Sequence, residues 1–231
     1  MKWFYIISLL YPTLTMAVIA TCNSSTLNTT TYQYTITQEN TTVFDVAHAT
    51  NRGVCDIARQ NLMADVTIPP NIGETFLIPS ETCTPDNETC ILRDTGRRTR
   101  TCIHGGPRLY YTVKGDTYDK IALRLNITTE ALMAGAVHGG VSESANQTLA
   151  VGRFLKVPLC EPSQCVIRPF SFKWGVYKDL AQRFGTTVGQ IMMLSATYNY
   201  SSLAFSPGGT FPPITMAINC TALSDDITVL S

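Results

Sequence analysis

The sequence carries no charge imbalance and few of the side chains that perform most catalysis. Its 17 basic and 17 acidic residues cancel, so it lacks the net positive charge that is typical of nucleic-acid binding. Only three histidines occur, His48, His104 and His138, and none belongs to a motif with a nucleophile and a carboxylate. No serine elbow or glycosidase carboxylate pair is evident. The composition favours a non-enzymatic protein with an uncharged ligand and no cofactor.

Long apolar runs are missing after the first 20 residues. Lys2 is followed by an apolar stretch that ends in small residues at Val18 and Ala20, which predicts a signal peptide over residues 1–20. A signal anchor is the alternative, but Pro12 interrupts the run, and about twenty unbroken apolar residues are needed to span a bilayer. We therefore expect an exported mature chain with no membrane segment.

The cysteines lack the C-x-x-C spacing of a zinc site, so we expect no metal. All 8 follow the predicted cleavage site, and an even number in an exported chain implies four disulfides. Asn-x-Ser/Thr sequons also fit a secreted glycoprotein. A cysteine occupies the middle position of the sequon at Asn219, which makes it the least favourable. We expect glycans among Asn23, Asn28, Asn40, Asn87, Asn126, Asn146 and Asn199.

Internal repetition organises the mature chain. Residues 111–133 align without a gap on residues 170–192, and a looser copy begins at Tyr32. Identical residues in the aligned copies match Lys114, Tyr118, Ala122, Arg124, Thr128 and Met133. The alignment predicts a module 1 (residues 30–80), a cysteine-containing linker (81–108), a module 2 (109–159), a degenerate module 3 (165–220) and a tail (221–231).

Each module has the same local pattern. An alternating start predicts a short strand, with the pairs Tyr34 and Ile36, Tyr111 and Val113, and Phe170 and Phe172. A polar turn, two short helices and a closing strand follow, and Asn126 or Gly185 ends the first helix. The predicted fold class is therefore α+β, with tandem βααβ modules. Units of this size bury too little apolar surface to be stable alone, so we expect disulfide cross-links to stabilise them.

The repeats suggest which cysteines pair. One pair brackets each module, and the remaining two cysteines join the second helix of module 1 to the linker. Closing loops of this length contributes roughly 4 kcal/mol each on a chain-entropy model. The predicted disulfides are Cys22–Cys83, Cys55–Cys90, Cys102–Cys160 and Cys165–Cys220.

The strand–turn–helix–helix–strand unit resembles a LysM domain. Its motifs are the opening Tyr111-Thr-Val-Lys-Gly-Asp-Thr and the closing Val-Pro158, and the passages Gly53-Val-Cys-Asp-Ile-Ala58 and Cys83-Thr-Pro-Asp-Asn-Glu-Thr-Cys90 resemble fungal LysM effectors. The resemblance implies a protein of the extracellular space, fungal cell wall or host apoplast that binds chitin and its oligosaccharides. It also implies that the protein sequesters chitin fragments or shields walls from host chitinases, which dampens immunity.

The implied sites lie at the turn after each first strand. In module 2, we expect a groove between Gly115, Asp116, Thr117, Tyr118 and the loop residues Val137, His138, Gly139, Gly140, Val141. Corresponding turn residues are Asn40, Thr41 and Thr42 in module 1, and Trp174 in module 3. Asp116 and Thr117 are equally well explained as helix caps, and Tyr118 as core. The family's Asn-Pro is missing from the loop of module 2, and Ala217 replaces the final proline in module 3.

Three questions stay open at the level of sequence. Arg97-Arg98-Thr99-Arg100 in the linker is either solvated or a processing-protease site. A glycan at Asn40 would crowd the turn of module 1, which would leave module 2 as the competent site. Two grooves could also face one oligomer in a ligand-induced dimer.

The alternative functions are a structural cell-wall protein and an inhibitor that binds host hydrolases without binding sugar.

Overall fold

The structure is a computed structural model that describes residues 22–103, 108–136, 144–162, 164–171, 173–195 and 213–221. Several sequence predictions lie outside these ranges: the signal peptide, the loop residues Val137, His138, Gly139, Gly140 and Val141, and also His104, Phe172, Asn199 and most of the tail. Within the described residues, no helix is long and apolar enough to cross a membrane.

Module 1 is a two-stranded antiparallel sheet with two helices in the connection between its strands. Tyr34 pairs with Phe76 in register, and α1 ends at Asn51 in the left-handed conformation that closes helices. The elements are a preceding 3-10 turn η1 (Ser24–Thr26), β1 (Tyr32–Thr35), α1 (Val43–Thr50), α2 (Val54–Gln60) and β2 (Thr75–Ile78).

Module 2 repeats this order and adds a second strand pair. In the opening strand, Tyr110 points into the core and Tyr111 is half exposed. Tyr110, and not the Tyr111 of the predicted alternation, lies opposite the buried Leu155. The elements are β3 (Cys102–Ile103), β4 (Leu109–Tyr111), α3 (Tyr118–Leu125), α4 (Thr129–Ala136), β5 (Phe154–Lys156) and β6 (Leu159–Cys160), with β3 paired to β6 and β4 to β5.

Module 3 has the longest strands. Its closing strand extends well past the predicted Ile214-Thr-Met, because it pairs along the whole opening strand. The first helices of modules 2 and 3 end at left-handed Asn126 and Gly185, as the sequence predicts. The elements are β7 (Gln164–Phe170), α5 (Tyr177–Phe184), α6 (Val188–Leu194) and β8 (Ile214–Thr221).

The disulfides match the pairs predicted from the repeats, and no cysteine is free. One of them joins facing strand residues, since Cys102 lies opposite Cys160 in the β3–β6 register. The four bonds are Cys22–Cys83, Cys55–Cys90, Cys102–Cys160 and Cys165–Cys220.

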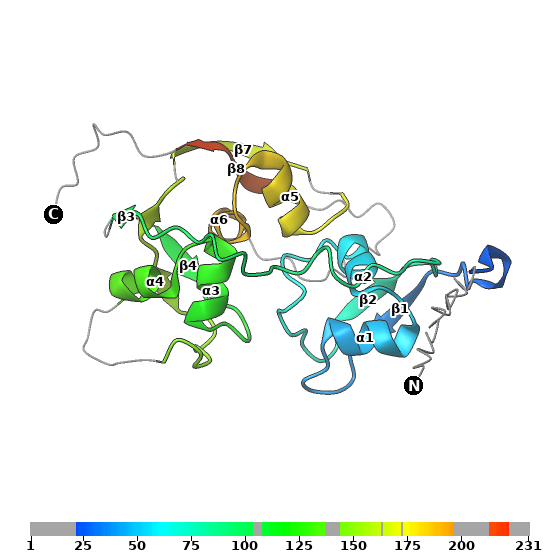
Figure 1. The fold of residues 1–231 in the computed structure, drawn as a ribbon. Helices are drawn as coiled ribbons and strands as arrows, with labels where there is room; N and C mark the ends of the chain where they lie inside the picture. Colours follow the sequence, from blue (N-terminus) through cyan, green and yellow to red (C-terminus); the bar gives the residue numbers. More distant parts are fainter. Residues whose placement is uncertain are drawn as a thin grey trace, which may run out of the picture.

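The modules share their cores. Figure 1 shows three lobes, each formed by a consecutive part of the chain, and α3 of module 2 packs against α6 of module 3. Leu62, Ala64 and Ile68 of module 1 lie in the core that modules 2 and 3 share. In return, Val176 of module 3 lies in the core of module 1. The three lobes are therefore packed against one another through shared apolar cores.

Candidate functional site

The turn before the first helix has the same backbone form in modules 1 and 2. Asn40 and Gly115 both have a left-handed φ, of 62° and 79° respectively. Two residues later, Thr42 and Thr117 cap the helix by accepting hydrogen bonds from backbone N–H groups of its first turn. We call residues 38–42, 114–117 and 173–176 the first turns of modules 1, 2 and 3. The shape that the first turns of modules 1 and 2 share makes differences in their surroundings informative.

In module 2 the first turn is closed by a buried ion cluster. The Asp116 side chain is fully buried, and its carboxylate accepts hydrogen bonds from Val113 N at 2.8 Å and from Arg124 Nη1. Arg124 Nε also donates to Asp65 Oδ2 of module 1 at 2.6 Å. Asp116 was a predicted ligand contact, but its oxygens are held by protein groups. It therefore positions the turn and does not reach solvent.

The charges of this cluster stabilise one another. Burial alone would raise the pKa of Asp65, but the adjacent Arg124 guanidinium and the hydrogen bonds from Thr67 outweigh it and hold that pKa below its usual value. Burial likewise disfavours the charged form of Arg124, and the neighbouring Asp65 reverses the effect, so the pKa of Arg124 is raised. Asp65 and Arg124 therefore stay ionised, and their ion pair links modules 1 and 2.

The rest of this turn lies against module 1. Lys114 Nζ donates to Pro70 O at 3.0 Å, and a Cβ atom on Gly115 would lie 3.0 Å from Pro69 Cδ. Lys120 Nζ donates a hydrogen bond to Gly115 O at 2.8 Å. Thr117 and Tyr118 are buried, in keeping with a cap and a core residue. Residues 61–74, which connect α2 to β2, thus form a docking surface for the first turn of module 2.

The predicted second wall of the module 2 groove, residues 137–141, lies outside the described residues, and the structure describes the loop only from residue 144. Leu149 N donates to Asp116 O at 2.8 Å, and Asp119 N donates to Ala145 O at 3.2 Å. The end of the loop therefore lies beside the first turn. These bonds engage the Asp116 carbonyl and the Asp119 N–H.

The first turn of module 3 docks on module 1 as well. Gly175 N donates to Arg59 O at 3.1 Å, and Val176 is buried. Trp174 does not share this burial: its side chain is 65% exposed, and the Arg59 guanidinium lies 5.7 Å from the ring centroid. The indole is held by a cation–π contact while most of it faces solvent.

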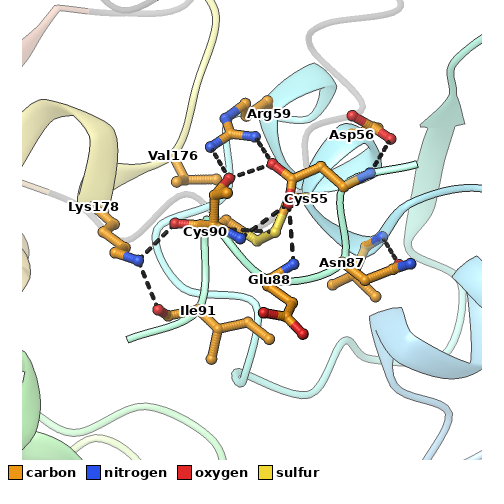
Figure 2. The surroundings of a disulfide bond; sticks show 12 residues. Cys55, Asp56, Arg59, Asn87, Glu88, Cys90, Ile91, Val176 and Lys178 are labelled. Carbon is orange, nitrogen blue, oxygen red and sulfur yellow. Dashed lines mark hydrogen bonds and ion pairs between the residues drawn. A yellow bond between two sulfur atoms is a disulfide. The ribbon is translucent and has the colours of Figure 1, made fainter. Parts of the chain in front are cut away.

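Arg59 is the centre of the contact between modules 1 and 3. It binds Asp86 of the linker at 2.7 Å and Asp179 of α5 at 2.9 Å, and these carboxylates raise its pKa. Nearby, Lys178 Nζ donates to Thr89 O at 2.6 Å and to Ile91 O at 2.8 Å. Figure 2 shows Lys178 and Ile91 beside the Cys55–Cys90 disulfide. The disulfide thus fixes the linker segment on which module 3 docks.

The first turn of module 1 is the most exposed of the three. Asn40 is exposed, and Thr41 Oγ1 donates to Gln38 O at 2.9 Å. Thr42 and Asp45 form a reciprocal capping box. Within the described part of the chain, these hydrogen bonds stay inside the turn and α1. Of the seven asparagines predicted to carry glycans, the six in the described ranges are all exposed: Asn23, Asn28, Asn40, Asn87, Asn126 and Asn146.

Known proteins match both the module and the whole chain. Residues 110–158 match the family model of the LysM domain. The secreted LysM effector LysM13 of Penicillium expansum is 46% identical over 210 residues, which cover 90% of this chain and 87% of the relative. The secreted LysM effector ECP6 of Passalora fulva is 31% identical over 178 residues, 76% of this chain and 75% of the relative.

The chain belongs to the fungal secreted LysM effectors. A third relative, the secreted LysM effector ELP2 of Colletotrichum higginsianum, is 36% identical over 122 residues, 52% of this chain and 62% of its own. The family model covers module 2 only, so the LysM character of modules 1 and 3 is inferred from their matching βααβ order.

The described part of this LysM effector contains no group of three or more His, Cys, Asp or Glu residues that could hold a metal ion. His48, the one histidine in the described ranges, is exposed in α1. Sequence reasoning missed the side chains that dock the modules: Asp65, Arg59 and Lys114. The role of Arg124 could have been predicted, because it falls three residues after Ile121 on the apolar face of α3. A charged side chain on such a face needs a buried partner of opposite charge.

Proposed function

We propose that this LysM effector binds chitin and its N-acetylglucosamine oligomers without cleaving them. The observation that carries the proposal is the family match over a chain with no net charge. N-acetylglucosamine offers an acetamide that donates and accepts hydrogen bonds, and a ring face of C–H groups. Backbone groups of a turn can pair with the acetamide, and an aromatic side chain can lie against the ring.

We place the accessible site at the first turn of module 1 and at Trp174, in preference to the turn of module 2. Exposure supports this choice. Asn40 faces solvent and Trp174 is 65% exposed, whereas Asp116 is fully buried and Gly115 lies against Pro69. The sequence alone favoured module 2 because its Gly115-Asp116-Thr117 is intact. In the structure, that turn is used for packing between modules.

The biological role that we propose follows from binding. A secreted, non-catalytic chitin binder would sequester chitin fragments or cover chitin in the fungal wall, which would limit cleavage by host chitinases and dampen chitin-triggered immunity. A cell-wall structural role, or inhibition of a host hydrolase by direct contact, would not require binding to a free oligomer. Binding measurements therefore separate these functions.

Calorimetry with chitin hexamer and cellohexaose tests the proposal. Heat is expected from chitin hexamer only, because cellulose lacks the acetamide. Trp174→Ala should weaken binding about tenfold, since an aromatic contact contributes roughly 0.5–1.5 kcal/mol beyond area burial. Tyr111→Ala is the matched control: Tyr111 is an exposed aromatic on β4, outside the first turns. Equal heats from both sugars, or none from either, would refute chitin recognition.

The sequon at Asn40 gives a second test of the site. A glycan there would crowd the first turn of module 1 with hydrated sugar, so Asn40→Gln should strengthen binding by glycosylated protein. Asn146→Gln removes another exposed sequon and should leave binding unchanged. If mass spectrometry shows a glycan on Asn40 and both variants bind like the parent, the turn of module 1 is not the site.

A further inference from the structure

The disulfides divide the chain into two covalently independent halves. Cys22–Cys83 and Cys55–Cys90 lie entirely before residue 91, and Cys102–Cys160 and Cys165–Cys220 lie entirely after residue 101. No free cysteine remains to bridge them. The backbone of residues 91–101 is therefore the one covalent link between module 1 and modules 2 and 3, and it contains the adjacent pair Arg97-Arg98.

The part of this link before the basic pair is accessible. Residues 93–97 are exposed. Gly96 has a φ of +69°, and a Cβ atom there would meet no atom within 4 Å, so this stretch projects into solvent. Arg98 is partly buried and pairs with Asp94 at 3.0 Å, but the Asp94 side chain is 53% exposed. The Arg98 side chain is itself only 17% exposed, so it must leave this pair before a protease can bind it.

Thr99, which directly follows the basic pair, is tethered by two backbone hydrogen bonds. Thr99 N donates to Asn126 O at 3.1 Å, and Thr128 N donates to Thr99 O at 3.1 Å. An endoprotease binds its substrate in an extended form, so both bonds must open first. This opening is local and leaves the shared cores intact. The folded chain should therefore be cut more slowly than the unfolded chain, but at the same bond.

Contacts between the halves do not depend on this link. Asp65 pairs with Arg124, and Arg59 pairs with Asp179, across the division. Leu62 and Ile68 lie in the core of modules 2 and 3, and Val176 lies in the core of module 1. Buried apolar and ionic contacts of this kind resemble those of a stable subunit interface.

We propose that Arg98–Thr99 is a cleavage site for an endoprotease that recognises paired basic residues, and that the cut protein stays assembled as two chains. Water adds across the peptide bond, which leaves a carboxylate on Arg98 and an α-amino group on Thr99. The new amino group still has an N–H to donate to Asn126 O. The proposal does not depend on sugar binding.

The test is to purify the secreted protein from a eukaryotic host and treat it with such a protease. Mass spectrometry under denaturing, non-reducing conditions should show two fragments, the second beginning at Thr99, because no disulfide joins the halves. Size exclusion under native conditions should show one species. Arg97→Gln and Arg98→Gln should each keep a single chain, whereas Arg93→Gln, an exposed arginine outside the pair, should be cut like the parent.

Two results would overturn the proposal. A parent chain that stays intact under these conditions would show that the basic pair is not a processing site. Fragments that separate under native conditions would show that the contacts between the modules cannot replace the covalent link. Arg97 is exposed, so the Arg97→Gln variant should fold normally and gives the cleaner control.

Discussion

The first turns of modules 1 and 2 share a backbone form and differ in what surrounds them. Asn40 and Gly115 occupy the same left-handed position, and a threonine caps the helix in both. The turn of module 1 satisfies its hydrogen bonds locally and faces solvent. That of module 2 is fixed by Arg124 and lies against Pro69. The two turns therefore share a backbone shape although their residues differ, and module 2 uses that shape for packing between modules.

The largest effect should come from breaking the ion cluster that fixes the turn of module 2. Asp65→Ala removes one of the two carboxylates that face Arg124, whose side chain is 1% exposed. Breaking a buried pair in this way destabilises proteins by about 3–5 kcal/mol. Chemical denaturation with disulfides intact measures it. Glu88→Ala, which breaks the exposed pair with Arg93, should cost less than about 1 kcal/mol. Similar losses in both variants would contradict the role of the cluster.

Acid should weaken the same cluster. The pKa of Asp65 is lowered in the folded protein. Its ionised form therefore contributes fully to the free energy of unfolding above its ordinary pKa of about 4, and this contribution is lost as the pH falls. Each such group adds a slope of up to about 1.4 kcal/mol per pH unit, measured by denaturation between pH 6 and 2. Asp65→Asn should flatten this slope. Asp45→Asn is the comparison in module 1: hydrogen bonds from Thr42 lower the pKa of Asp45, but the group is exposed and should matter little.

The smallest effect concerns the glycine of the turn. Gly115→Ala should lower the free energy of unfolding by about 1–2 kcal/mol for the left-handed backbone, and by somewhat more because of the contact with Pro69. Gly73→Ala separates these causes, since Gly73 has a φ of +88° and open space around it. Thermal unfolding of the two variants gives the difference. A larger loss for Gly73→Ala would show that the turn of module 2 is not tightly packed on module 1.

The order of elements and the disulfides could be predicted because both depend on local or repeated sequence. Alternation and helix spacing predict each βααβ unit, and matched cysteine positions predict the pairs. The length of β8 and the inward position of Tyr110 were missed. Both are set by the register with a strand roughly 45 or more residues away, which local periodicity does not encode.

The surroundings of the turns could not be predicted, because they depend on contacts between modules. Asp65 and Arg124 are 59 residues apart, and nothing near Asp65 marks it as a partner. Arg183 occupies the equivalent position on α5 and is exposed. The same residue at the same repeat position is thus buried in one module and solvated in another, and only the neighbouring module decides which.

The ion cluster also limits how such proteins can diversify. Modules joined by an inert linker could be exchanged between relatives as cassettes. Here, a replacement for module 1 must bring a carboxylate to the position of Asp65, and a replacement for module 2 must bring the matching guanidinium of Arg124. A chimera that carries one without the other leaves a buried charge uncompensated. Successful recombination should therefore transfer both modules together.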